Sequence, residues 1–414
     1  MKRIFISLFF FAFMWTAAGA DASPELLFVR WPANPDAVWY SFRIVPVTQH
    51  FGRKEMRPPI YEDGHVFRDS VMIEKEITDS YDGPGILCCQ VKAIGLDGQS
   101  ISAYSAPVPM EKAAQEMERY APKIRVKYHE QNGTVLLYPA YSFVKIPHAV
   151  SYEVEITDEE PENPDGCEPS VHRISQGIVT IPELFDELPR QGTVWWRVRG
   201  LDEDGGPVGV WSEAEKIVND PAENWETGIL GDSISHGGGR MSYSPADWPY
   251  NYAYYLDFPT INMSRSGDKT EDLLRRFDAD VLPFHVLYLL IMGGTNNLRS
   301  GETAEEVIAD LEALQEKCRS GGIEPVLLTI PPIAPERILK YYHQPTAENW
   351  KAEFDKVNGW IRTQTHIDTA APFAMYEDMP ENLAADGLHP DKEAKEKMGK
   401  IINEKFSEGG LRLR

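Results

Sequence analysis

The sequence predicts a multidomain chain: two β-sandwiches followed by a three-layer α/β domain built on a parallel sheet. The first half contains a repeat of about 100 residues, whose strands alternate apolar and polar residues with a period of two. After Asp220-Pro221, apolar strands instead alternate with amphipathic helices, which is typical of a doubly wound sheet. Polar motifs follow several of these later strands, at the edge where such sheets bind ligands.

The first 20 residues predict a secretory signal peptide. The basic pair Lys2-Arg3 precedes an apolar run over residues 4–15, and Ala18-Gly19-Ala20 supplies a small-residue cleavage site. The run is shorter than the ~20 apolar residues that a membrane span needs. We therefore expect a secreted or periplasmic protein, with a signal peptide over residues 1–20 and no membrane anchor.

Composition excludes several classes of partner. The formal net charge of −23 argues against nucleic acid and anionic membrane surfaces, because both require a basic patch. No group of His, Cys and Asp has metal-ligand spacing, so we expect no metal and no cofactor. The cysteines fit neither a disulfide framework nor a zinc pattern, and one disulfide stays open among Cys88, Cys89, Cys167 and Cys318.

The repeat consists of two similar β units. Trp31-Pro32-Ala33 recurs as Tyr138-Pro139-Ala140, and the strand over residues 37–44 recurs over residues 149–156. Short alternating strands separated by Asp-Gly turns indicate a β-sandwich. The two units resemble tandem fibronectin type III modules, which places one module at residues 21–115 and the next at 116–220.

The remaining chain, residues 221–414, predicts the α/β domain. The third strand is apolar on both faces, as a central parallel strand must be. The expected strands are residues 228–230, 260–262, 285–292 and 325–330, and the expected helices are residues 270–279, 303–319, 349–363 and 391–406.

Four polar motifs carry the chemistry of this domain. Three follow successive strands, and the fourth precedes the last helix. In order they are Gly231-Asp232-Ser233, the segment 262–267, the segment 293–297, and Asp386-Gly387-Leu388-His389-Pro390. Together they resemble the four blocks of the SGNH, or GDSL-type, hydrolases. The resemblance implies a flavodoxin-like three-layer domain with a parallel sheet.

A serine, a distant histidine and a nearby carboxylate are the groups that acyl transfer requires. A serine hydroxyl is a weak nucleophile, so a histidine must take its proton and a carboxylate must hold the histidine tautomer. We expect Ser233, His389 and Asp386 in these roles. The resemblance implies that the oxyanion is stabilised by the backbone N–H groups of Ser233 and Gly267 and by the side-chain amide of Asn296.

Two positions depart from the family pattern, and two others are candidate substrate contacts. Ser264 replaces the first glycine of the second block, and Asn297 replaces the aspartate after Asn296. An inactive relative is therefore an open alternative. His236 follows the nucleophile turn and is a candidate substrate contact, with solvent exposure as the open alternative. We also expect Trp248 to contact substrate, since the loop over residues 240–251 mixes aromatic and polar residues that suit stacking on sugar rings.

These features predict a secreted serine esterase that removes small acyl groups, most simply acetyl, from an acylated carbohydrate substrate. A lipase, lysophospholipase or thioesterase of the same family is the first alternative. A glycan-binding surface protein with an inert hydrolase domain is the alternative from another class. The carbohydrate assignment rests on fold-level analogy, and the acyl group, the polymer and the oligomeric state stay open.

Overall fold

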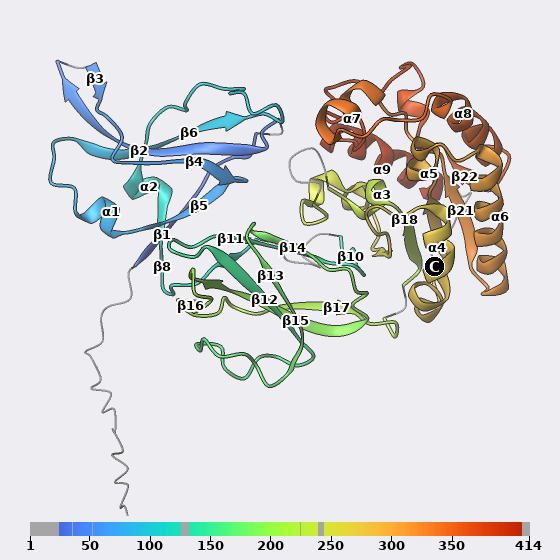
Figure 1. Ribbon diagram of the computed structural model, residues 1–414, viewed down its shortest axis with the longest axis horizontal. Coiled ribbons are helices and arrows are strands. Elements are labelled where there is room, and N and C mark those ends of the chain that lie inside the picture. The colour runs from blue at the N-terminus through green and yellow to red at the C-terminus, as the bar shows by residue number, and fades with distance from the viewer. Residues whose placement is uncertain are drawn as a thin grey trace, which may run out of the picture.

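The computed structural model describes residues 25–34, 36–51, 53–125, 132–223, 225–238 and 244–407 (Figure 1). The predicted signal peptide lies outside these residues. In Figure 1 the first β unit (blue) and the second (green) lie on one side of the molecule, and the α/β domain (yellow to red) lies on the other. Within the described residues, no helix combines the length and the apolar character that a membrane crossing would need.

The first β unit consists of a three-stranded and a five-stranded sheet that share one hydrophobic core. Tyr40, Phe42 and Ile44 are buried on one face of a strand, as the two-residue period predicts, and they pack with Val29 and Ile73 of the other sheet. One sheet has the order β5 (Ser70–Glu74), β1 (Leu26–Arg30), β8 (Ala114–Met117). The other is β3 (Arg53–Met56), β2 (Trp39–His50), β6 (Ile86–Ile94), β7 (Val108–Pro109), with β4 (Tyr61–Phe67) on β2. Two one-turn helices, α1 (Glu76–Asp79) and α2 (Met110–Ala113), belong to this unit.

The second β unit repeats this arrangement. Tyr152, Val154 and Ile156 are buried together with Trp196, which lies opposite Ile156 on the neighbouring strand. One sheet has the order β14 (Glu183–Phe185), β11 (Ala140–Val144), β9 (Lys123–Ile124). The other is β13 (Arg173–Val179), β12 (Ser151–Thr157), β15 (Gly192–Leu201), β16 (Pro207–Val208), with β17 (Glu215–Asn219) on β15. The N-terminal half is thus β-rich, and its assignment to fibronectin type III modules stays a prediction.

The third region contains the predicted parallel sheet, which the structure confirms. Its strands lie in the order β10 (Val135–Leu136), β19 (Ile261–Asn262), β18 (Thr227–Gly231), β20 (Tyr288–Met292), β21 (Glu324–Leu328), β22 (His366–Ile367). All of the pairings are parallel. Numbered along the chain from β18, the last five strands have the order 2-1-3-4-5, which is the flavodoxin-like order.

Helices cover both faces of this sheet. Leu289 and Ile291 pack into a core with one group of helices, whereas Leu290 and Met292 pack on the opposite face. The first face is covered by α4 (Thr270–Asp280), α6 (Ala304–Ser320) and α8 (Trp350–Ile361). The opposite face is covered by α9 (Lys392–Ser407), α3 (Ser233–His236) and the 3-10 helix η2 (Tyr252–Tyr255).

The remaining short elements are α5 (Thr295–Ser300), α7 (Pro335–Tyr342), η1 (Trp248–Tyr250), η3 (Leu282–Phe284) and η4 (Ala371–Phe373). Of these, α5 and α7 matter most for the site, because they follow strands β20 and β21 at the edge of the sheet where the polar motifs gather.

The edge strand β10 belongs to residues that the sequence assigns to the second β module. It pairs with β19 through Val135 and Leu136. Nearby, the hydroxyl of Tyr138 donates to Asp280 on α4 at 2.7 Å. The side-chain amide of Asn132 donates to the carbonyl oxygens of residues 253 and 256 at 2.7 and 2.8 Å. The α/β sheet is therefore completed by a segment that lies between β9 and β11 of the second β unit, and the domain boundaries stay a prediction.

A buried ion-pair cluster joins the three regions. Arg68 of the first β unit is 2% exposed, and its guanidinium lies 2.7 Å from the carboxylate of Glu183 in the second unit. The same guanidinium pairs with Asp247, which precedes η1 in the α/β region. Arg68 thus joins the first β unit to the second β unit and to the α/β region through ion pairs, in addition to the covalent chain.

Candidate active site

The nucleophile turn begins where β18 ends. Gly231 lies so close to β20 that an added Cβ would come within 2.5 Å of the Met292 carbonyl oxygen, so glycine is required there. Asp232 caps the one-turn helix α3, because its side chain accepts the backbone N–H of Ile234 at 2.9 Å. Ser233 is then the first residue of α3, at the carboxyl end of a central strand. That is where open α/β sheets bind ligands.

The loop before α9 brings a histidine and a carboxylate to this serine. His389 Nε2 lies 3.0 Å from Ser233 Oγ, and His389 Nδ1 lies 2.9 Å from Asp386 Oδ2. The other oxygen of Asp386 accepts the backbone N–H groups of Leu388 and His389, at 2.7 and 2.8 Å. The structure therefore brings together all three residues that the sequence selects, in a continuous Ser-His-Asp connection.

Backbone geometry explains the glycine in this loop. Gly387 has a φ of +81°, and an added Cβ would lie 2.5 Å from the carbonyl oxygen of Ala334. The carbonyl of Gly387 accepts the N–H of Ala334 at 2.7 Å, next to the start of α7. A side chain at position 387 would therefore push the Asp-x-x-His turn away from the loop that supports it.

The electrostatics of the triad favour an ionised Asp386. Burial alone would raise its pKa, but the charge of His389 and the hydrogen bonds from His389 and Leu388 outweigh burial and hold the pKa below its usual value. An ionised Asp386 accepts the Nδ1–H of His389, which leaves Nε2 as the acceptor for the hydroxyl of Ser233. This is the tautomer that a general base needs.

Sequence reasoning missed Tyr342, the last residue of α7. Its hydroxyl donates to Asp386 Oδ2 at 2.8 Å and lies 3.2 Å from His389 Nδ1. The carboxylate therefore receives hydrogen bonds from two side chains as well as from backbone. No local pattern marks this residue, because its partner lies 44 positions away in the sequence.

The three expected oxyanion donors follow β18, β19 and β20, which are neighbouring strands of the sheet. In the described chain, the backbone N–H groups of Ser233 and Gly267 make no hydrogen bond. Gly267 has a φ of +90°, and an added Cβ there would meet nothing within 4 Å. The side chain of Asn296 donates one N–H to the Asp268 carbonyl at 2.8 Å, which fixes the amide and leaves the second N–H available.

The departure at Asn297 has a structural explanation. Asn297 is buried, and its amide donates to the carboxylates of Glu302 at 2.6 Å and Glu271 at 3.0 Å. Its carbonyl oxygen accepts the N–H of Thr270 at the start of α4, at 3.1 Å. An ionised aspartate could not donate to two carboxylates, so an asparagine suits this position better than the aspartate of the family pattern.

A buried lysine lies under the nucleophile turn, and sequence reasoning missed it as well. Lys395 on α9 is fully buried, and its ammonium donates to the carbonyl oxygen of Ile234. Burial lowers the pKa of Lys395 to about 7, although Asp232 and Asp386 act in the opposite direction. Burial also raises the pKa of Asp232 to about 6, and its Oδ2 is buried without a hydrogen-bond partner in the described chain.

The predicted substrate contacts at His236 and Trp248 are not supported by their surroundings. His236 is 3% exposed; its Nε2 lies 2.7 Å from the Tyr138 carbonyl, and its Nδ1 accepts the Ser266 backbone N–H at 3.2 Å. The ring can therefore position the segment before Gly267. Trp248 is 8% exposed and packs in the core of the second β unit. Part of the predicted stacking loop, residues 240–243, lies outside the described residues.

The described residues show how the potential metal ligands and the cysteines are arranged. Among them, no three His, Cys, Asp or Glu side chains are grouped to hold a metal ion. All four cysteines are free, and three of them, Cys88, Cys89 and Cys318, are buried. In this structure the four cysteines therefore form no disulfide with one another.

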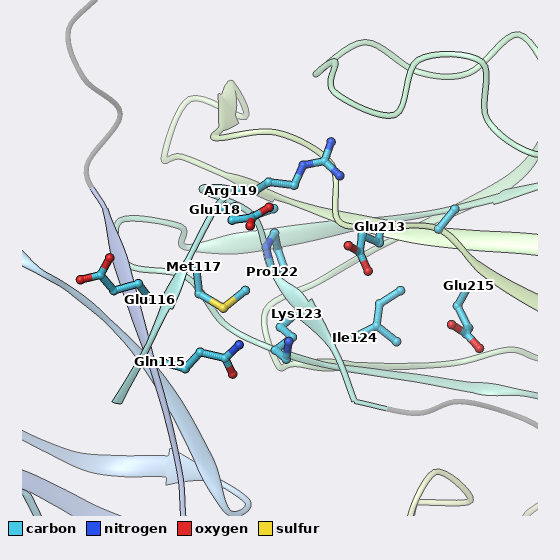
Figure 2. A pocket seen from close by; sticks show the side chains of 12 residues that line it. Gln115, Glu116, Met117, Glu118, Arg119, Pro122, Lys123, Ile124, Glu213 and Glu215 are labelled. Atoms are coloured by element: carbon cyan, nitrogen blue, oxygen red, sulfur yellow. The ribbon is translucent and has the colours of Figure 1, made fainter. Parts of the chain in front are cut away.

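A separate cavity of about 320 Å³ lies at the β units, away from the triad (Figure 2). Its lining comes from residues 115–119, 121–124 and 213–215, on and beside β8, β9 and β17. Figure 2 shows that charged side chains such as Glu118, Arg119 and Glu213 surround it. None of its lining residues belongs to the four polar motifs, so it plays no part in the chemistry described above.

Comparison with known proteins places the four motifs in one family. Residues 229–397 match the GDSL-like Lipase/Acylhydrolase family. No curated protein matches the chain. Among solved structures, a GDSL-like lipase from Bacteroides thetaiotaomicron is 15% identical with a TM-score of 0.38, and the match covers 45% of this chain and 90% of that one. A lipase/acylhydrolase from Enterococcus faecalis is 25% identical with a TM-score of 0.37, covering 46% and 98%. A mutant of an acetyl-xylooligosaccharide esterase from Geobacillus Stearmophilus is 18% identical with a TM-score of 0.33, covering 46% and 97%.

Proposed function

We propose that the GDSL-type acylhydrolase domain formed by residues 229–397 hydrolyses carboxylic esters through Ser233, His389 and Asp386. The observation that carries this proposal is the continuous connection from Ser233 Oγ to His389 (3.0 Å) and from His389 to Asp386 (2.9 Å). The distances are those of hydrogen bonds between a nucleophile, its base and the group that orients the base.

The reaction follows from where charge develops. Ser233 Oγ attacks the acyl carbon while His389 Nε2 takes the hydroxyl proton, and Asp386 stabilises the imidazolium that forms. The negative charge on the former carbonyl oxygen is stabilised by the N–H groups of Ser233, Gly267 and Asn296. Collapse of this intermediate releases the alcohol, which takes the proton from His389. Water then repeats the sequence on the acyl-enzyme and releases the carboxylic acid.

The substrate that we propose is a carbohydrate with small acyl esters, most simply acetyl. Support comes from the sequence: a predicted signal peptide at residues 1–20 would export the chain to where polysaccharides lie, and the net charge of −23 would disfavour anionic lipid surfaces.

Two measurements test the proposal. A fluorophosphonate should add one adduct, located at Ser233, and Ser233→Ala should abolish both labelling and hydrolysis of 4-nitrophenyl acetate. Activity on 4-nitrophenyl esters should fall steeply from acetate to octanoate, and acetate should be released from an acetylated glycan. Labelling at another residue would refute the nucleophile. A preference for long acyl chains would favour a lipase or thioesterase, and glycan binding without hydrolysis would favour the surface-protein alternative.

A further inference from the structure

Arg299 is a cation without a partner beside the proposed oxyanion site. It lies near the end of α5, three residues after Asn296, and residues three apart share one face of a helix. In the chain as the structure describes it, the guanidinium makes no hydrogen bond and no ion pair. Its Nε atom is completely buried and unsatisfied. Such groups are rare in folded proteins, because a buried N–H without an acceptor is costly.

Among the partly buried arginines of this region, Arg299 alone has a guanidinium with no hydrogen bond or ion pair in the described chain. Between residues 225 and 407, four described arginines are partly buried, and the other three all have protein acceptors. These are Arg265 with Asp268 at 3.7 Å, Arg276 with Asp268 at 2.7 Å, and Arg337 with the Met379 carbonyl. Arg337 Nε is also buried without a partner, but the Arg337 guanidinium still reaches one acceptor, whereas the Arg299 guanidinium reaches none in the described chain.

The guanidinium of Arg299 lies within electrostatic range of the reaction centre. Burial lowers its pKa, while Tyr342, Asp386 and Asp232 act in the opposite direction. The guanidinium is therefore within electrostatic range of the triad carboxylate, of the tyrosine that supports it, and of the residue before the nucleophile. Neither the carboxylate of Asp386 nor that of Asp232 forms an ion pair with Arg299.

The surroundings of Arg299 contain a second unsatisfied polar group. The carbonyl oxygen of Arg299 accepts the N–H of Ala347 at 3.0 Å, which ties α5 to the segment between α7 and α8. The residue before Ala347 is Thr346, whose Oγ1 is also buried without a hydrogen-bond partner in the described chain. Two buried donors that lack acceptors thus flank a single backbone hydrogen bond.

We propose that Arg299 binds a carboxylate carried by the ester substrate, so that the enzyme prefers anionic esters over neutral ones. A guanidinium presents a planar fork of N–H groups that matches a carboxylate with two parallel hydrogen bonds. The inference rests on the proposed esterase function and adds a substrate class to it. The carboxylate can belong to the alcohol part, as in an acetylated uronic acid, or to the acyl part, as in a succinyl ester.

Matched substrate pairs test the inference and separate the two sources. Acetylated oligogalacturonides with free carboxylates are compared with their methyl-esterified forms, and an O-succinyl with an O-butyryl methyl glucoside. Within one pair, kcat/KM should be roughly tenfold or more higher for the charged member, as expected for a charge-assisted hydrogen bond. Arg299→Gln should remove this preference, mainly through a higher KM, and Arg299→Lys should restore part of it.

Controls separate substrate binding from charge and folding effects. Arg275→Gln removes the same charge from an arginine of α4 that is 70% exposed, and it should keep the preference. The melting temperature of Arg299→Gln should equal or exceed that of the wild type, because no protein contact is lost.

Three outcomes would overturn the inference: equal rates within both pairs, a preference that survives in Arg299→Gln, or a preference that is lost equally in Arg275→Gln. If the wild type hydrolyses 4-nitrophenyl acetate while one of these holds, only the role of Arg299 is wrong. If the wild type hydrolyses no ester, the proposed function fails and the inference fails with it.

Discussion

The carbonyl oxygen of Tyr138 lies 2.7 Å from Nε2 of His236, so a residue from the predicted second β module fixes the histidine three positions after the nucleophile. A carbonyl oxygen only accepts, and Nε2 must therefore carry the ring proton. Nδ1 is then the acceptor for the Ser266 backbone N–H at 3.2 Å, next to the oxyanion donor Gly267. The β region thus contributes directly to the geometry of the hydrolase site.

We expect the α/β domain to depend on the residues before it. A chain that begins at residue 221 would lack β10, Asn132 and Tyr138, which pair with β19, the η2 region and α4. It should melt at a lower temperature than the full chain and lose most of its esterase activity. A chain that begins at residue 118 keeps these contacts and should retain more of both. Equal stability and activity of the two truncated chains would contradict this dependence.

His236 should make the protein sensitive to acid. Burial lowers its pKa to about 4 from 6.5. Between these values the unfolded chain binds more protons than the folded one, so the free energy of unfolding falls as pH falls from 6.5 toward 4. At ~1.4 kcal/mol per pKa unit, the loss is at most about 3.5 kcal/mol. His236→Gln should show a shallower decline in urea unfolding measured over this range. Parallel pH profiles for the two proteins would refute the assignment.

Asn296→Ala should lower kcat by about 10²–10³ with little change in KM, because its amide bonds most strongly to the oxyanion of the transition state. Its partner Asp268 keeps the amide oriented through a 2.8 Å hydrogen bond. Steady-state kinetics on 4-nitrophenyl acetate measure both constants. An effect confined to KM would make Asn296 a residue that binds the ground state instead.

The sequence predicted the parts of this site that are encoded locally. Ser233 follows a strand, and Asp386 and His389 are three residues apart, so their chemistry is visible in short motifs. The predicted strands and helices of the α/β domain also match the observed ones within a few residues. The continuous apolar run of β20 and the helical apolar periods of α6 and α9 indicate both their type and their burial.

The parts that the sequence did not predict depend on distant partners. Strand β10 has two residues, too few for a periodic pattern, and it joins a sheet whose next strand begins at Ile261. Tyr342 acts on Asp386 across 44 positions from a helix, α7, that was not predicted. The burial of His236 depends on Tyr138, 98 positions earlier. No local signal marks such residues, because tertiary packing alone creates their environment.

Removal of the Tyr342 hydroxyl should slow the reaction without abolishing it. Tyr342→Phe deletes the hydrogen bond to Asp386 Oδ2, while the bonds from His389 and from backbone remain. We expect kcat to fall about 3- to 10-fold, as for the net contribution of one typical hydrogen bond, because the other bonds to the carboxylate remain. Asp386→Ala should cost more, because it removes the group that holds the tautomer of His389. If Tyr342→Phe matched Asp386→Ala in kcat, the tyrosine would have a direct role in proton transfer.

Lys395 should give the folded protein a stability that rises in alkali. Burial lowers its pKa to about 7 from 10.5, so between these values the unfolded chain carries more protons and the contribution of Lys395 to stability increases with pH. The same ammonium holds the Ile234 carbonyl under the nucleophile turn. Buried tyrosines and cysteines titrate in the alkaline range with raised pKa values and act in the opposite direction.

The informative quantity is therefore the difference in unfolding free energy between the wild type and Lys395→Met, measured in urea at pH 7 and pH 9.5. This difference should move in favour of the wild type as pH rises, by at most ~1.4 kcal/mol per pH unit. A difference that is the same at both pH values would mean that Lys395 keeps its ordinary pKa, and that its charge is compensated by Asp232 and Asp386 more fully than burial penalises it.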